Sequence, residues 1–80
     1  MIKVEKTLAT VLRGSSDANV GFSGLCSLVK SLGFSERVRG DHFIYYKEGI
    51  EEILNLQPIG AKAKAYQVKQ VRSVILKYKL

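Results

Sequence analysis

Apolar residues recur at helical spacing in three segments of the chain, and each segment is predicted to form a helix. The first covers residues 2–13 and ends before Gly14, with an apolar stripe made by Val4, Leu8, Val11 and Leu12. The second starts at a candidate N-cap, Ser23, and ends at Gly33, with a stripe made by Leu25, Leu28, Val29 and Leu32. The third begins near Tyr66, and its core-facing side is made by Val68, Val71, Val74, Ile75 and Tyr78.

The spacing of apolar residues changes from helical to alternating after Gly33, which predicts β-strands. Three strands, separated by tight turns at residues 40–41 and 48–49, are expected at residues 34–39, 42–47 and 51–57. Strands joined by such turns form an antiparallel meander. Pro58 is expected to end the third strand, and residues 59–64 to form a loop of small residues and lysines before the last helix.

The second predicted strand carries two different sets of side chains, because side chains alternate between the two faces of a strand. One face takes His42, Ile44 and Tyr46, and the other takes Phe43 and Tyr45. The sequence leaves open which face is covered. The tyrosines are predicted to pack in the core or across strands, their commoner role in short strands, and stacking on nucleic-acid bases is the alternative.

The predicted order of elements is typical of a small α+β protein. A chain of 80 residues, 46% hydrophobic and 25% charged, is expected to fold as a single domain over residues 1–80. Its one cysteine, Cys26, excludes an internal disulfide and a zinc site and is predicted to be a buried structural thiol. No leader peptide and no run of about 18 apolar residues is recognised, so a cytoplasmic protein without a membrane anchor is expected.

Positive charge is concentrated in the last third of the chain. The sequence holds 13 Lys and Arg against 7 Asp and Glu, a formal net charge of +6. Acids and bases balance over residues 1–52, whereas residues 53–80 hold no acid and these bases: Lys62, Lys64, Lys69, Arg72, Lys77 and Lys79. Such a distribution favours a polyanion or an acidic protein as partner. A helix lying on an anionic membrane is a weaker alternative, because the core needs the apolar face of this helix.

His42 is the only histidine of the chain and the first candidate for chemistry. It follows Gly40 and Asp41, which are predicted to form the turn that opens the second strand. Imidazole is the side chain that most readily takes or gives a proton near neutral pH, and nearby arginines favour a phosphodiester as substrate. The alternative is a histidine that only packs or caps, which is its commoner role on a strand.

The order of motifs from Gly33 onward resembles the HicA family of bacterial toxins. The chain shows Gly-Phe, then Arg-Gly-Asp-His, then a strand with Phe-Ile-Tyr, a further strand, a lysine-rich loop and a basic helix. The resemblance covers residues 22–80, with residues 1–21 as an extra N-terminal helix and loop. Its most specific part is the Gly-x-His turn from Gly40 to His42.

The resemblance implies a fold like the double-stranded RNA-binding domain, with the order α-β-β-β-α. It also implies an endoribonuclease, the mRNA interferase toxin of a type II toxin–antitoxin system, which cleaves mRNA and arrests translation. Its implied partners are mRNA and a HicB-type antitoxin that occludes the active site, and neither a metal nor a small-molecule cofactor is expected. His42 matches the catalytic histidine of the family, and Gly40 matches the glycine that shapes the turn.

In the implied reaction the ribose 2′-hydroxyl attacks the adjacent phosphorus while His42 transfers a proton. Contacts to RNA phosphates are expected from Arg37, Arg39, Lys47, Lys62, Lys64, Lys69 and Arg72. The second acid or base stays open between Lys47, a tyrosine and water. Asp41 stands where the family usually has serine, and its carboxylate is expected either to interact with the imidazole or to repel a phosphate. Both effects are weakened if the two side chains point to opposite faces of the strand.

Two other functions are compatible with the same residues. One is a non-catalytic RNA-binding module of the same fold, in which His42 contacts only backbone or base. The other is an interaction protein whose basic helix serves to bind an acidic partner.

Overall fold

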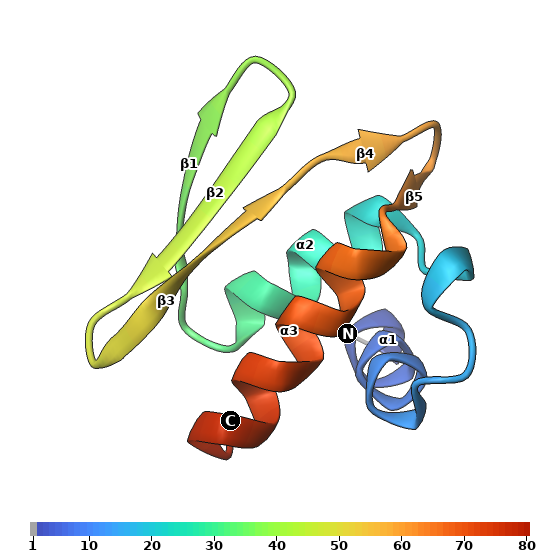
Figure 1. Cartoon of the computed structure of the whole chain (residues 1–80), viewed down its shortest axis with the longest axis horizontal. Coiled ribbons are helices and arrows are strands. Elements are labelled where there is room, and N and C mark those ends of the chain that lie inside the picture. The colour runs from blue at the N-terminus through green and yellow to red at the C-terminus, as the bar shows by residue number, and fades with distance from the viewer. Residues whose placement is uncertain (1) are drawn as a thin grey trace.

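The chain folds as an α-β-β-β-α unit preceded by an extra helix, which confirms the predicted α+β class and order (Figure 1). The computed structural model describes residues 2–80. Its helices are α1 (Ile2–Arg13), α2 (Phe22–Ser31) and α3 (Ala65–Tyr78), with a 3₁₀ turn η1 (Asp17–Asn19). Its strands are β1 (Ser35–Arg39), β2 (His42–Lys47), β3 (Ile50–Leu56), β4 (Pro58–Ile59) and β5 (Lys62–Ala63). None of the helices in this part of the chain is long and apolar enough to cross a membrane.

The main sheet has the order β1-β2-β3 and is antiparallel throughout. Helices α2 and α3 pack on one face of this sheet, and α1 packs on these two helices rather than on the sheet (Figure 1). The β1–β2 turn consists of Gly40 and Asp41, and Gly40 has a φ of 62°. A positive φ at the first central residue alone is the type II′ arrangement, which follows the twist of the two strands and favours glycine there. The hairpin therefore places His42 at the first position of β2.

The core lies between the sheet and the helices and reaches α1 through Val11. Tyr45, Leu54 and Leu56 supply the sheet side, and all three are buried. Phe43 lies on the same face, where its ring meets Phe22 edge to face at 5.1 Å. The predicted packing role holds for Tyr45, whereas Tyr46, on the other face, is 45% exposed. The sequence left open which face of β2 is covered, and burial shows that the helices cover the face of Phe43 and Tyr45.

Tyr45 also carries a polar contact inside this layer. Its hydroxyl donates a hydrogen bond of 2.6 Å to Oε2 of Glu36 on β1. Burial raises the pKa of Tyr45 well above its ordinary range, and the neighbouring Cys26 and Glu36 act in the same direction. The hydroxyl thus stays protonated and donates to the carboxylate.

Tyr45→Phe is expected to destabilise the fold by about 1.5 kcal/mol, because a partly buried, charge-assisted hydrogen bond is lost. For a chain of this size that corresponds to a Tm lower by roughly 6 to 12 °C. Tyr46→Phe is the matched control, since the hydroxyl of Tyr46 has no hydrogen-bond partner among the described residues. Thermal unfolding of both variants checks this, and equal Tm values would show that the contact to Glu36 contributes nothing.

Two predicted details of the helices are wrong. Leu12 is 42% exposed, because Val11 takes the centre of the contact with α2 and α3 and Leu12 projects about 100° further round α1. Ser23 is not the N-cap of α2: the helix starts at Phe22 after Gly21, and no side chain caps it. The backbone N–H of Phe22 instead donates to the carbonyl of Ala61 at 2.9 Å, which satisfies a free donor of the helix end.

The connection from β3 to α3 is a small hairpin rather than the predicted loop. Pro58 pairs with Ala63 and Ile59 with Lys62, so Pro58 begins β4 after β3 has ended. The hairpin is held to the start of α2, because the N–H of Ala63 donates to the carbonyl of Val20 at 2.9 Å. It delivers the chain to α3 with Lys64 at the N-cap position.

Candidate active site

His42 lies on the face of the sheet that no helix covers. Register places Arg39 directly opposite His42 and Arg37 opposite Ile44, so both arginines project from the same face. On the other side of β2, Asn55 stands opposite Ile44. The imidazole side chain is 46% exposed. The expected neighbourhood of one histidine and two arginines is thus assembled by β1 and β2, with Asn55 added from β3, and is open to solvent.

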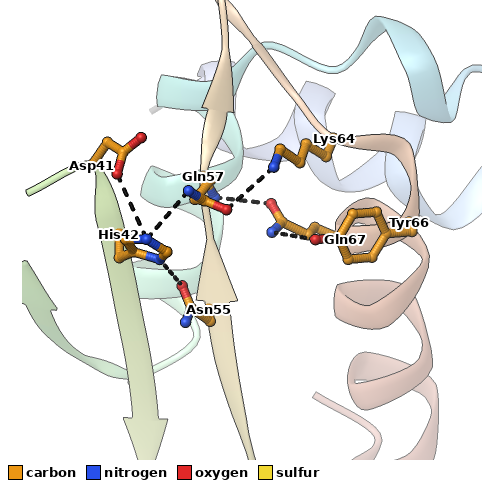
Figure 2. Close-up of polar contacts among 7 residues, drawn as sticks. All are labelled: Asp41, His42, Asn55, Gln57, Lys64, Tyr66 and Gln67. Atoms are coloured by element: carbon orange, nitrogen blue, oxygen red, sulfur yellow. Dashed lines mark hydrogen bonds and ion pairs between the residues drawn. The ribbon is translucent and has the colours of Figure 1, made fainter.

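Both ring nitrogens of His42 have a side-chain partner on or next to β3 (Figure 2). Nδ1 lies 3.3 Å from Oδ1 of Asn55. Nε2 lies 3.3 Å from Nε2 of Gln57, the residue that follows β3. The imidazole is therefore held from two sides in a fixed orientation.

Gln57 is itself fixed from two sides. Lys64 donates from Nζ to Oε1 of Gln57 at 3.2 Å, so the side-chain oxygen of Gln57 faces the lysine and its NH₂ group faces His42. The backbone N–H of Gln57 donates to Oε1 of the buried Gln67 at 2.9 Å. Gln67 in turn donates from Nε2 to the hydroxyl of Tyr66 at 3.3 Å. Figure 2 shows this chain of contacts running from the sheet to the first turn of α3.

These contacts determine which nitrogen of neutral His42 carries the proton. An ammonium can only donate, so Lys64 fixes the orientation of the Gln57 amide, and that amide can only donate to Nε2 of His42. The contacts to Gln57 and Asn55 therefore favour the neutral tautomer in which Nε2 is unprotonated and Nδ1 donates to Oδ1 of Asn55, whereas the Asp41 carboxylate, 3.7 Å from Nε2, favours a proton on Nε2. The base of the site is Nε2, and its lone pair points toward the Gln57 and Lys64 side.

Nitrogen-15 NMR of the neutral imidazole is therefore expected to show Nδ1 as the protonated nitrogen, with more than about 90% of this tautomer. Free imidazole side chains prefer the opposite tautomer, so the result is distinctive. The chain has one histidine, so the spectrum needs no assignment. Gln57→Leu is expected to move the populations toward protonated Nε2. A wild-type spectrum dominated by protonated Nε2 would refute the proton assignment.

Comparisons of the chain with protein-family models, with curated proteins and with solved structures found no match. Within the described residues, no three His, Cys, Asp or Glu side chains come together as a potential metal site.

Asp41 lies closer to the imidazole than strand alternation suggested. Its Oδ1 is 3.7 Å from Nε2 of His42. The expectation that the two side chains diverge is wrong, because Asp41 belongs to the turn, where the alternation of a strand does not apply. Its side chain is 66% exposed. The carboxylate is thus placed to interact with an imidazolium at Nε2, while solvent screens much of its charge.

Four of the seven predicted phosphate-binding side chains lie away from His42. Lys47 is at the opposite end of β2, about 17 Å along the strand, where its ammonium lies over Gly33. Lys62 donates to Oδ1 of Asn19 at 2.9 Å, on the η1 side of the molecule. Two more lie on α3 toward Asp17: these are Lys69 and Arg72. Only Arg37, Arg39 and Lys64 remain beside the histidine.

Arg72 is a structural residue. Its guanidinium binds both carboxylate oxygens of Asp17, at 2.9 and 3.1 Å, and also donates to the carbonyl of Val11 at 3.1 Å. The hydrogen bond from Arg72 holds the pKa of Asp17 below its ordinary value. Lys77 is paired in the same way with Glu52, at 2.9 Å. Part of the basic excess of residues 53–80 therefore ties α3 to the rest of the fold and is not free for a partner.

Asn55 and Gln57 are the site residues that sequence reasoning missed. A signal for them existed, since polar side chains at alternate positions beside Ile53 mark one face of the third strand. Lys47 and Ile50 are paired and share one face of the sheet. His42 and Asn55 each lie an odd number of positions from that pair, so Asn55 and Gln57 share the other face with His42.

Proposed function

We propose that this chain is a metal-independent endoribonuclease, the mRNA interferase toxin of a HicA-type toxin–antitoxin pair, acting in the cytoplasm. One observation carries the proposal: an exposed imidazole has a side-chain partner at each ring nitrogen, with Arg39 opposite it on β1 and Lys64 bound to its partner Gln57. General acid–base catalysis needs a positioned group that titrates near neutral pH, and a phosphodiester needs cations around it.

The arrangement supports transfer of the 2′-hydroxyl proton to Nε2 of His42. The 2′-oxygen then bonds to the adjacent phosphorus, and the bond from phosphorus to the 5′-oxygen breaks. The leaving 5′-oxygen takes a proton, so the products are a 2′,3′-cyclic phosphate and a 5′-hydroxyl. In this reaction Arg39, opposite His42, and Lys64, bound to Gln57, would neutralise the charge that builds up on the phosphoryl oxygens.

The position of Lys64 also bears on the second acid. Of the earlier candidates, Lys47 lies at the far end of β2 and does not reach the phosphorus that His42 would serve. Lys64 reaches the histidine through a single intervening side chain, Gln57. We assign the proton delivered to the leaving oxygen to the Lys64 ammonium or to a water bound to it. Gln57 has to release Nε2 when the substrate hydroxyl arrives.

The toxin role and the antitoxin partner rest on the resemblance of residues 22–80 and on charge. The net charge of +6 favours both an RNA substrate and an acidic inhibitor. An inhibitor that covers the open face of the sheet would bury His42 together with Arg37 and Arg39. It would then block access without contacting the helices.

A second function, RNA binding without cleavage, is favoured by one observation. The Gln57 amide already occupies Nε2 at 3.3 Å, so the imidazole has no free basic nitrogen in the absence of substrate. In such a module His42, Asn55 and Gln57 would form a polar platform for a base or a phosphate.

The products of the reaction separate the two functions. The purified chain is incubated with a defined single-stranded RNA in excess EDTA, and the ends of any fragments are analysed. Fragments with a 2′,3′-cyclic phosphate and a 5′-hydroxyl are expected. Intact RNA that is nevertheless bound would establish the binding module instead. Fragments that vanish in EDTA and return with Mg²⁺ would contradict the metal-independent reaction.

A further inference from the structure

The open face of the sheet, which also carries His42, contains a shallow hollow lined by Arg37, Arg39, Ile44, Tyr46 and Ile53. Ile53 is 60% exposed and Tyr46 is 45% exposed, while Ile44 is half-buried. The helices pack on the other face of the sheet, so these apolar side chains contribute little to the core. Large apolar side chains gathered at one exposed place indicate a surface that binds something.

The rim of the hollow is positively charged. Arg37 and Arg39 project from β1, and neither forms an ion pair with any described residue. Other cations of the described residues do form ion pairs, Arg72 with Asp17 and Lys77 with Glu52. Two unneutralised guanidinium groups over an aromatic and aliphatic floor match a ligand that is anionic on one side and flat and apolar on the other.

We propose that this hollow is a nucleobase subsite, in which one unpaired base of a single-stranded RNA stacks on Tyr46 against Ile53 while its phosphates meet Arg37 and Arg39. The inference rests on the proposed function, since it extends the RNA site around His42. Base stacking on an aromatic side chain with arginines along the backbone is the usual chemistry of single-strand binding. Paired bases cannot lie flat on this sheet, so the subsite selects single strands.

The position of the hollow relative to His42 decides which base it takes. Tyr46 is four residues further along β2, about 13 Å from His42 along the strand. The stacked base therefore belongs to a neighbouring nucleotide of the bound strand and not to the reacting ribose. Arg39 lies opposite His42 and Arg37 opposite Ile44, so the two guanidinium groups mark the path between the two positions.

The test uses a fluorescein-labelled single-stranded RNA of about eight nucleotides, a length within the site sizes of single-strand binders. Affinity is measured by fluorescence anisotropy for the full chain with His42→Ala, which prevents cleavage during titration. Tyr46→Ala on this background is expected to raise Kd by about 5-fold to 150-fold, the range that loss of one stacked base gives. Tyr46→Phe keeps the ring and is expected to bind like its parent.

Two matched pairs of variants separate this face from the rest of the surface. Ile53→Ala is expected to weaken binding, whereas Leu76→Ala, at a residue equally exposed on α3, is expected to leave it unchanged. Arg37→Gln is expected to lower the slope of log Kd against log salt by about 0.7, the value for one phosphate contact on a single strand. Arg13→Gln removes the same charge from α1 and is expected to leave the slope unchanged.

Each contrary outcome has a distinct meaning. If wild-type protein cuts RNA and Tyr46→Ala binds within about twofold of its parent, the subsite is refuted and the proposed function stands. If no variant binds RNA, the subsite and the proposed function both fail. If Tyr46→Ala changes only the sedimentation coefficient, the hollow is a contact between two copies of the chain and the subsite is refuted.

Discussion

His42→Ala is expected to lower the single-turnover rate of RNA cleavage by about 10²-fold to 10⁴-fold, the contribution of a positioned general acid or base. No other imidazole is present to take over the proton transfer. The side chain of His42 is 46% exposed and contributes nothing to the core, so the fold is expected to persist. The rate is measured with purified protein in EDTA, with enzyme in excess over a labelled RNA.

Circular dichroism and RNA affinity serve as the controls for this variant. Both are expected to match wild type, with the affinity changed by no more than about threefold. Cleavage that survives at more than about a tenth of the wild-type rate would show that His42 is not the proton-transfer group.

Lys64→Gln is expected to have the second-largest effect, a loss of about 10²-fold in cleavage rate. In the proposed reaction this change removes a cation beside the phosphoryl group, an effect that typically costs about 10²-fold to 10³-fold. Gln57 also loses the donor that orients its amide, so the imidazole is held less firmly.

Lys62→Gln is the matched control for Lys64→Gln. Both changes remove one positive charge, and the two residues are only two positions apart in the chain. Lys62 contacts Asn19 at 2.9 Å and lies away from His42. Its replacement is expected to change cleavage by less than about threefold at moderate salt. Equal losses in the two variants would indicate a general effect of charge and no specific role for Lys64.

The helices, the three main strands and the turn before His42 followed from local patterns. The spacing of apolar residues and the residues that end an element are local features of the sequence. Gly14, Gly33 and the alternation of β2 were therefore enough to predict these elements. The short β4–β5 hairpin escaped prediction because its stability comes from Val20 and Phe22, some forty residues earlier in the chain. The same contact replaced Ser23 as the cap of α2.

The site was only partly predictable, because its composition depends on register and on long-range contacts. Regular pairing from Lys47 and Ile50 would place Asn55 opposite His42, but an irregularity between Tyr45 and Lys47 shifts the register. The pair of Phe43 with Leu56 then brings Gln57 opposite His42. This shift keeps the same side chains on the same face of β3, so the alternation of apolar and polar residues does not reveal it.

The sequence also did not reveal which lysine and arginine side chains are bound by acidic or amide side chains elsewhere in the fold. Arg72 looked like a member of a basic face, yet Asp17, far away in sequence, neutralises it. Lys62 and Lys64 looked equivalent, yet one remains in β5 near Asn19 and the other reaches Gln57. The composition gives the net charge, whereas the fold determines which charged side chains lie near His42.

Under the proposed function one proton on His42 controls RNA cleavage, and a paired titration of proton binding and cleavage rate tests this. The single imidazole is titrated by nitrogen-15 NMR, and the single-turnover rate in EDTA is measured over the same pH range. The cleavage rate is expected to rise with pH along a limb whose midpoint coincides with the NMR midpoint, within about 0.3 pH units. A rate that is flat through the titration of His42, or a limb displaced by more than about one unit, would contradict it.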